Sequence, residues 1–308
     1  MEHRPMQDSP IFTVLLPVAL VIIMFGLGLS LTTGNFRDVL KTPKALVVGL
    51  ILQIVVMPAI CFGMVYLFGL EPALAVGMMM LAASPGGTSS NLYSLLAGGD
   101  VALNIVLTAL NSALAIVTMP LIINFSLAHF YGEGQAISLP FNKVLQIFVV
   151  VLIPMLLGLW LRRRSPGLAD RAAKPVKTLS ALFLIAVVII ALVKEWETLK
   201  VWAPVVGFVT LSFNIVSLAI GYFGPRALGI GRPQAIATSM EIGIHNAALA
   251  IAIALSPLLL NNPTMAIPAA IYGLIAYLTA ACFVYLLKRW NAGIAASPVG
   301  KEAVTGHR

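Results

Sequence analysis

The stretch SMEIGIHNAALAIAIAL, residues 239–255, reads as a membrane-buried helix that contains a group of polar residues. Glu241, His245 and Asn246 fall within six positions of one another in an otherwise apolar run. A lone carboxylate at membrane depth costs several kcal/mol unless it is paired or neutralised, so Glu241 is a candidate functional residue. The alternative is that Glu241 lies near a helix end and reaches water, or bonds its neighbours as a structural group.

The composition places the whole chain in a membrane. Of its 308 residues, 60% are hydrophobic and 10% charged, and the mean hydropathy of +0.99 is far above that of soluble domains. Apolar stretches of about 20 residues, enough to cross a hydrocarbon core of roughly 30 Å, recur along the chain. We therefore expect an all-α integral membrane protein with about nine transmembrane helices, at 11–31, 43–68, 72–97, 101–128, 141–161, 178–194, 201–223, 234–260 and 265–288.

The basic residues are distributed unevenly over the loops between these spans. The net charge is +8, and most of the 19 Lys and Arg residues fall in 32–42, 98–100, 162–177, 224–233 and the C-terminal tail. Because basic loops stay in the cytoplasm, we expect a plasma (inner) membrane protein with the N-terminus outside and the C-terminus cytoplasmic. This clustering accounts for the positive charge without nucleic acid, and no feature indicates an obligatory protein partner.

A second polar interruption, AASPGGTSSNLYS at 82–94, lies in the middle of the third expected span. Pro85, Gly86 and Gly87 disfavour a continuous helix there. Unwound backbone at membrane depth must line a protein-walled cavity or bind a ligand. The third and eighth spans are five apart, so related segments would cross the membrane in opposite directions, as in the inverted-topology repeats of secondary transporters.

Oxygen-bearing side chains follow the first interruption and recur in the fourth span. They are Thr88, Ser89, Ser90 and Asn91, then Asn104, Thr108 and Asn111 on one helix face. Hydroxyl and amide oxygens suit a hard cation, and the start of a resumed half-helix suits an anion. Ordinary interhelical hydrogen bonding is the alternative for this stripe, for Gln53 and for His245.

The motifs of several other functions are missing. The chain has neither a Walker lysine after a glycine-rich loop nor an H-E-x-x-H motif. ATP-driven transport and zinc-dependent proteolysis therefore lack their parts, and we expect no enzymatic activity.

Three stretches resemble the bile acid:sodium symporter family: FRDVLKTPKALVVGLILQIVVMPA (36–59), ASPGGTSSNLYSLLAGGDVALNIVLTALNS (83–112) and SMEIGIHNAALA (239–250). The resemblance extends from about residue 17 to 288, and P-G-G-x-x-S-N with a downstream E-x-G-x-x-N is its most specific element. It implies sodium-coupled symport of a small organic anion, bile-acid-like or a keto or hydroxy acid, by alternating access. It also implies the nine-helix form of the family, with two discontinuous crossed helices.

The resemblance further implies one transporter unit over 1–308, divided into two domains that move against each other. Core-domain segments fall at about 72–161 and 234–288, and panel-domain segments at about 11–68 and 178–223.

Carried over by the resemblance, two sodium sites and a substrate site fall on named residues. The first sodium site falls on Ser90, Asn91, Asn104, Thr108 and Glu241. The second falls on Gln53, Glu241, the carbonyls of Ile242 and Ile244, and His245, where the family commonly has glutamine. The substrate anion would meet Thr88, Ser89 and Asn246. The expected partners are thus sodium ions, two in number, a small organic anion and membrane lipid.

Two other functions remain open from the residues. One is proton-coupled transport of an organic anion through Glu241 and His245. The other is a channel or a non-transporting membrane receptor.

Overall fold

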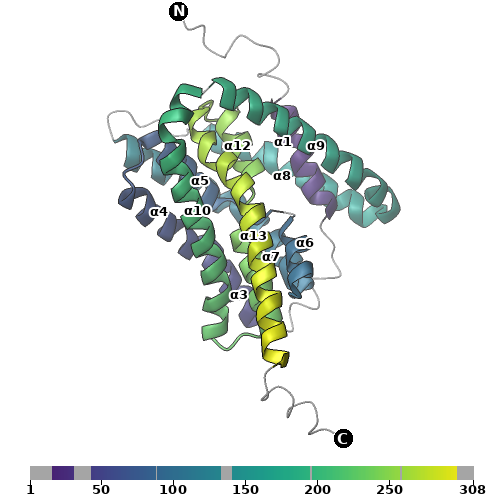
Figure 1. The fold of residues 1–308 in the computed structure, drawn as a ribbon. Coiled ribbons are helices and arrows are strands. Elements are labelled where there is room, and N and C mark those ends of the chain that lie inside the picture. The colour runs from purple at the N-terminus through teal and green to yellow at the C-terminus, as the bar shows by residue number, and fades with distance from the viewer. Residues whose placement is uncertain are drawn as a thin grey trace, which may run out of the picture.

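The computed structural model of the chain describes residues 16–30, 43–87, 89–132, 141–194, 196–256 and 259–296. These residues are helical almost throughout, and they contain an isolated β-bridge but no strand (Figure 1). The elements are α1 (Leu16–Ser30), α3 (Pro43–Ile51), the π-helix η3 (Leu52–Val56), α4 (Met57–Leu67), α5 (Pro72–Ala83), α6 (Ser89–Ala97), α7 (Val101–Tyr131), α8 (Phe141–Arg164), α9 (Pro166–Lys194), α10 (Trp196–Ala227), α11 (Arg232–Gly243), α12 (Ala247–Leu255), the 3-10 helix η4 (Thr264–Ala266) and α13 (Ile267–Ala296).

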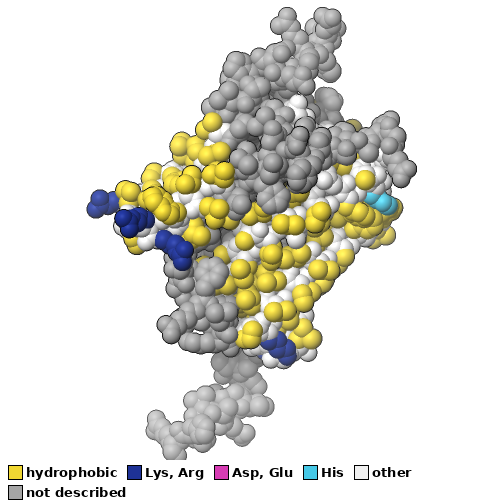
Figure 2. All heavy atoms as spheres, turned by 180° about the vertical axis from the view of Figure 1, so that it is seen from behind, with side chains coloured by type: hydrophobic (Ala, Val, Ile, Leu, Met, Phe, Trp, Pro, Cys, Tyr) yellow, Lys and Arg dark blue, Asp and Glu magenta, His cyan; other side chains and the backbone are white. Residues whose placement is uncertain are grey.

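Several of these helices have the length and surface of membrane spans. In the described part of the chain, four helical segments are long and apolar enough: Pro43–Leu67, Val101–Tyr131, Lys200–Ala227 and Thr264–Arg289. Hydrophobic side chains cover much of the face in Figure 2, and such a surface is typical of contact with lipid. The chain is therefore a multi-pass membrane protein. The expected number of nine spans and the orientation of the termini stay predictions.

The same series of elements occurs twice along the chain. After α4 and again after α10 comes a glycine in the left-handed region, Gly69 at φ 57° and Gly229 at φ 76°, a common way to end a helix. The next helix, α5 or α11, carries a proline in its first turn and has 12 residues. An interruption and a nine-residue helix follow, α6 in one case and α12 in the other. This repetition matches the expected correspondence of the third and eighth spans.

The half-helices α5, α11 and α12 lie in the interior of the molecule, whereas α6 exposes Leu92, Leu95 and Leu96. Every residue from Ala73 to Ala83 in α5 is buried, and so is every residue from Leu249 to Leu255 in α12. A helix that is apolar on all sides needs other helices around it. α5 packs against α4, α7, α13 and η4, which enclose it.

A wide turn in the middle of the second expected span carries Gln53. In the π-helix η3 the Met57 N–H donates to the carbonyl of Leu52, five residues earlier. Pro58 follows, and it cannot donate the next α-helical hydrogen bond because it has no N–H. Single π turns of this kind are frequent at functional sites. Gln53 is buried, with 3% of its surface exposed.

Two glycines allow α1 and α8 to pack in close contact. A Cβ added to Gly28 would lie 2.1 Å from the Met155 carbonyl oxygen, and one added to Gly158 would lie 2.3 Å from that of Phe25. Small residues at such contacts let membrane helices approach closely.

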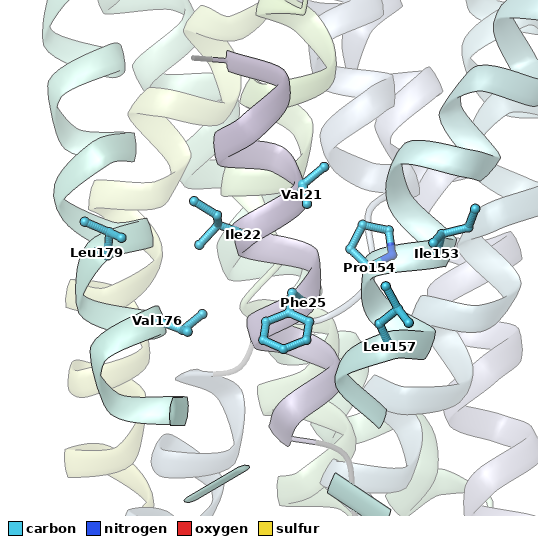
Figure 3. A pocket seen from close by; sticks show the side chains of 8 residues that line it. All are labelled: Val21, Ile22, Phe25, Ile153, Pro154, Leu157, Val176 and Leu179. Atoms are coloured by element: carbon cyan, nitrogen blue, oxygen red, sulfur yellow. The ribbon is translucent and has the colours of Figure 1, made fainter. Parts of the chain in front are cut away.

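The helix α9 also packs against α1, and the three helices α1, α8 and α9 border an apolar cavity of about 560 Å³ (Figure 3). The division into core and panel domains concerns which helices move together. That division stays a prediction.

Replacing Gly158 by valine should force α1 away from α8, because a side chain there would overlap the backbone of α1. Overpacking of this kind costs about 1–3 kcal/mol, so the unfolding temperature in detergent should fall by several degrees. Gly207→Val in α10 is the matched control, since nothing lies within 4 Å of a Cβ there. Equal unfolding temperatures for the two variants would contradict this packing.

Candidate functional site where two interrupted helices meet

The two interruptions bond to each other through their backbones. The Gly87 N–H donates to the Ile244 carbonyl at 2.6 Å, and the Asn246 N–H donates to the Pro85 carbonyl at 2.8 Å. Between these bonds, Gly86 and His245 form an isolated antiparallel bridge. Each unwound segment therefore satisfies backbone groups of the other, which lipid could not do.

Beside this crossing lies the carboxylate of Glu241, which is completely buried. Its Oε1 accepts from the Gly86 N–H at 3.2 Å and from Asn111 Nδ2 at 3.0 Å. Its Oε2 accepts from the hydroxyls of Ser90 at 3.3 Å and Thr108 at 2.5 Å. All four donors are neutral, and no basic side chain in the described ranges forms an ion pair with it. The alternative that Glu241 reaches water near a helix end does not fit its burial.

A side chain at Gly86 would overlap the Glu241 carboxylate, so this position requires glycine. A Cβ there would lie 2.3 Å from the Cδ and Oε2 of Glu241 and 2.4 Å from Oε1. Only a residue without a side chain lets the backbone approach the carboxylate and donate to it.

A second polar group also adjoins the crossing. Gln53 Nε2 donates to the Ser84 carbonyl at 2.7 Å and lies 3.3 Å from His245 Nδ1. The same His245 Nδ1 lies 3.3 Å from the Ser84 carbonyl. We call Gln53, Ser84 and His245 the histidine cluster. Its members bond to one another and to the Ser84 carbonyl, whereas Glu241 bonds to Gly86, Ser90, Thr108 and Asn111.

Several buried polar atoms near the crossing have no hydrogen-bond partner. They are Asn91 Oδ1, Asn111 Oδ1, Ser94 Oγ, Gln53 Oε1 and His245 Nε2. Buried polar atoms are nearly always bonded, so unpartnered ones invite a ligand. Asn111 donates to Glu241 through its Nδ2, so its unpartnered Oδ1 belongs to the surroundings of the carboxylate.

The expected site residues divide among these positions. Ser90 and Thr108 bond Glu241 directly, and Asn104 joins through its Oδ1, which accepts from the Ser90 hydroxyl at 2.8 Å. Gln53 and His245 instead contact each other, and both contact the Ser84 carbonyl.

Of the remaining expected residues, Ile242 and Ile244 are buried at the end of α11, and Ser89 begins α6. Asn246 caps α12, where its Oδ1 accepts from the Leu249 N–H at 3.0 Å. Thr88 lies outside the described residues. Whether each of these residues is a ligand stays a prediction.

Three residues that form hydrogen bonds in or beside the site were not among the ligands that the resemblance implies. Asn111 shares a helix face with Asn104 and Thr108, so its spacing was a usable signal. Asn214 and Tyr272 both donate to the Gly243 carbonyl, at 2.7 and 2.9 Å, and so hold the last turn of α11. No local sequence signal indicates this contact, because the partners are 29 residues apart in each case.

Comparisons with known proteins agree with the resemblance seen in the sequence. A model described as the sodium bile acid symporter family matches residues 17–202. The chain is 29% identical over 255 residues to the uncharacterized sodium-dependent transporter YocS of Bacillus subtilis, covering 83% of this chain and 77% of that protein.

Two further relatives are a plant and an animal protein. The probable sodium/metabolite cotransporter BASS1, chloroplastic, of Arabidopsis thaliana is 31% identical over 255 residues, which cover 82% of this chain and 62% of that protein. The ileal sodium/bile acid cotransporter of Cricetulus griseus is 26% identical over 243 residues, or 78% of this chain and 69% of that protein. With a family model covering more than half of its length, the chain belongs to the sodium bile acid symporter family, whose members are transporters and not enzymes.

Proposed function

We propose that this chain carries a small organic anion across the plasma membrane together with sodium, by alternating access. The observation that supports this most is the buried Glu241 carboxylate, held only by neutral donors where two interrupted helices cross. A buried negative charge with no basic partner favours a bound cation, because an unpaired ion is poorly tolerated away from water. Membership in a family of sodium symporters supports sodium as that cation.

The donor set around Glu241 suits sodium. It consists of oxygen atoms from a carboxylate, from the hydroxyls of Ser90 and Thr108, and from the amide of Asn111, whose Oδ1 has no other partner. Asn91, a ligand implied by the family resemblance, also has an unpartnered Oδ1 and would add a further oxygen. Hard cations prefer oxygen ligands. In the described ranges no group of three or more His, Cys, Asp or Glu residues gathers, as sites for softer metals require.

An ion at this position would connect three elements. Ser90 and Asn91 come from α6, Thr108 and Asn111 from α7, and Glu241 from α11. Binding a positive charge there would neutralise the carboxylate and hold the two interrupted spans together. If the substrate binds best to that same arrangement, sodium and substrate raise each other's affinity by linkage, which is the basis of coupling.

The substrate would bind near the starts of the resumed half-helices α6 and α12, at Thr88, Ser89 and Asn246. A helix start attracts anions through its free N–H groups and its dipole. The Oδ1 of Asn246 is already the capping acceptor of α12, so the amide is left to act as a donor, which suits a carboxylate. Small keto or hydroxy acids and bile-acid-like anions both carry such a group.

Replacing Glu241 by glutamine should remove the response to sodium, because the neutral amide no longer favours a cation. In detergent, the rise of the unfolding temperature in sodium chloride relative to choline chloride should disappear. Uptake of labelled taurocholate or pyruvate by expressing cells, whichever the wild type transports, should fall about tenfold or more, the effect of losing one interaction with a charge.

The matched control for this change is Glu71→Gln, since Glu71 precedes α5 and its side chain forms no capping hydrogen bond. That variant should keep both the rise of the unfolding temperature in sodium chloride and the uptake of labelled substrate. Uptake that persists unchanged in Glu241→Gln at normal expression would refute the proposal.

Replacing external sodium by choline at fixed pH should reduce uptake into proteoliposomes to background. Full uptake in choline under an inward proton gradient would instead indicate proton coupling through Glu241 and His245. The same vesicles should show counterflow, in which internal unlabelled substrate draws labelled substrate inward. A channel or a receptor would show no counterflow under any gradient.

Replacing Asn246 by serine should weaken substrate binding while keeping the fold, because serine also caps helices but lacks the amide donors. A thermal-shift screen of organic acids in sodium chloride first identifies an acid that stabilises the wild type. For that acid, the apparent KM in Asn246→Ser should rise about tenfold, the loss of one hydrogen bond to a charge. The rise of the unfolding temperature caused by sodium alone should remain in this variant. An unchanged KM would mean that the substrate binds away from Asn246.

A further inference from the structure

The histidine cluster occupies the place where a second cation is expected from the family resemblance. Gln53 presents its Nε2, a donor, to the Ser84 carbonyl and to His245 Nδ1. A donor in that position repels a cation. The Gln53 Oε1 is buried without a hydrogen-bond partner, so it is the one side-chain amide oxygen that the cluster still offers, beside the donating Nε2 of the same amide.

His245 cannot replace the missing oxygen, whichever ring nitrogen carries the proton. If Nδ1 accepts from Gln53, then Nε2 carries the proton of the neutral ring and no lone pair is left. If Nδ1 donates to the Ser84 carbonyl, the ring offers the Nε2 lone pair, which is nitrogen and a poor ligand for a hard cation. An amide in this position would have offered an oxygen.

The surrounding residues hold the imidazole in this place. The Phe213 ring stacks on it, with centroids 5.4 Å apart and planes 16° from parallel, and the Tyr272 ring lies 5.5 Å away on a tilt of 60°. The phenol of Tyr272 also donates to the Gly243 carbonyl at 2.9 Å. The imidazole therefore packs against two aromatic rings, and one of them, Tyr272, also holds the end of α11.

Two other groups expected at a second cation, the Ile244 carbonyl and the Glu241 carboxylate, already accept hydrogen bonds. The Ile244 carbonyl accepts from the Gly87 N–H at 2.6 Å, a bond of the crossing itself. The Glu241 carboxylate accepts from four donors, on Gly86, Ser90, Thr108 and Asn111, none of which belongs to the histidine cluster. The donors and acceptors around the two polar groups thus favour a cation at Glu241 and not at the histidine cluster.

We propose that His245 closes the second cation position, so that this chain binds one sodium ion in each transport cycle. The inference rests on the proposed sodium coupling and specifies its stoichiometry. Gln53, Ser84 and His245 then form an ion-free contact that joins η3 to the crossing. One sodium ion carried with a monovalent anion transfers no net charge, so uptake of such an anion would not respond to membrane potential.

Equilibrium binding of ²²Na⁺ to the purified full chain in detergent tests this directly. The wild type should bind about one sodium ion per chain, and His245→Gln, which restores an amide oxygen, should bind about two. His129→Gln is the matched control, because His129 is an exposed residue at the end of α7 that contacts Tyr66. It should bind one ion, as the wild type does.

Two ions per wild-type chain would overturn the inference and leave the proposed function intact. One ion in a folded His245→Gln variant would also overturn it, because the histidine would then not be what closes the position. If that variant fails to fold, the wild-type ratio still decides. Binding of no sodium by the wild type would refute the proposed function itself, which is a distinguishable result.

Discussion

Backbone hydrogen bonds between the two interruptions hold the centre of this molecule together. Neither unwound segment could exist alone at membrane depth, because its free N–H and C=O groups would have no water to bond. Gly87 and Asn246 donate across the crossing to Ile244 and Pro85, so each segment satisfies the other. The half-helices α5, α6, α11 and α12 therefore meet at this contact, and the residues around it lie close together for that reason.

The crossing also explains how a carboxylate can be buried among apolar helices. Gly86 lies in the bridge, and its N–H bonds Glu241 only because no Cβ stands between them. Neutral donors stabilise the charge but do not cancel it, so the site retains a net preference for a positive ion. A cation bound there would be coordinated by residues of the three helices α6, α7 and α11. That arrangement joins ion binding to the relative position of the interrupted spans, which is what a symporter needs.

The two polar groups at the crossing differ in the atoms they present. Around Glu241 lie carboxylate, hydroxyl and amide oxygens, whereas the histidine cluster offers one unpartnered amide oxygen, that of Gln53, beside an amide donor and a ring nitrogen. A single substituted position, His245, thus separates an oxygen-rich site from one that does not suit a hard cation. With one ion, the sodium gradient would drive accumulation of the substrate less steeply than with two, and a monovalent anion would move without net charge.

Much of this arrangement follows from the sequence alone. Hydropathy predicts helices in a membrane, Pro85 with Gly86 and Gly87 predicts a break, and helical spacing places Asn104, Thr108 and Asn111 on one face. These are local properties, and Glu241 stands out as a carboxylate in an apolar run for the same reason. The structure contains both interruptions, and it brings Ser90 and Thr108 to Glu241, a grouping that the family resemblance implies.

What the sequence by itself determined is therefore the class of fold, the breaks in two spans and the identity of the central acid. Only the tertiary structure decided which groups face one another: that Asn111 bonds Glu241, that Gln53 turns to Ser84 and His245, and that Gly28 and Gly158 join α1 to α8. The physical reason is that hydropathy and helix breaking depend on neighbours along the chain. Contacts between residues more than a hundred positions apart depend on how whole helices dock.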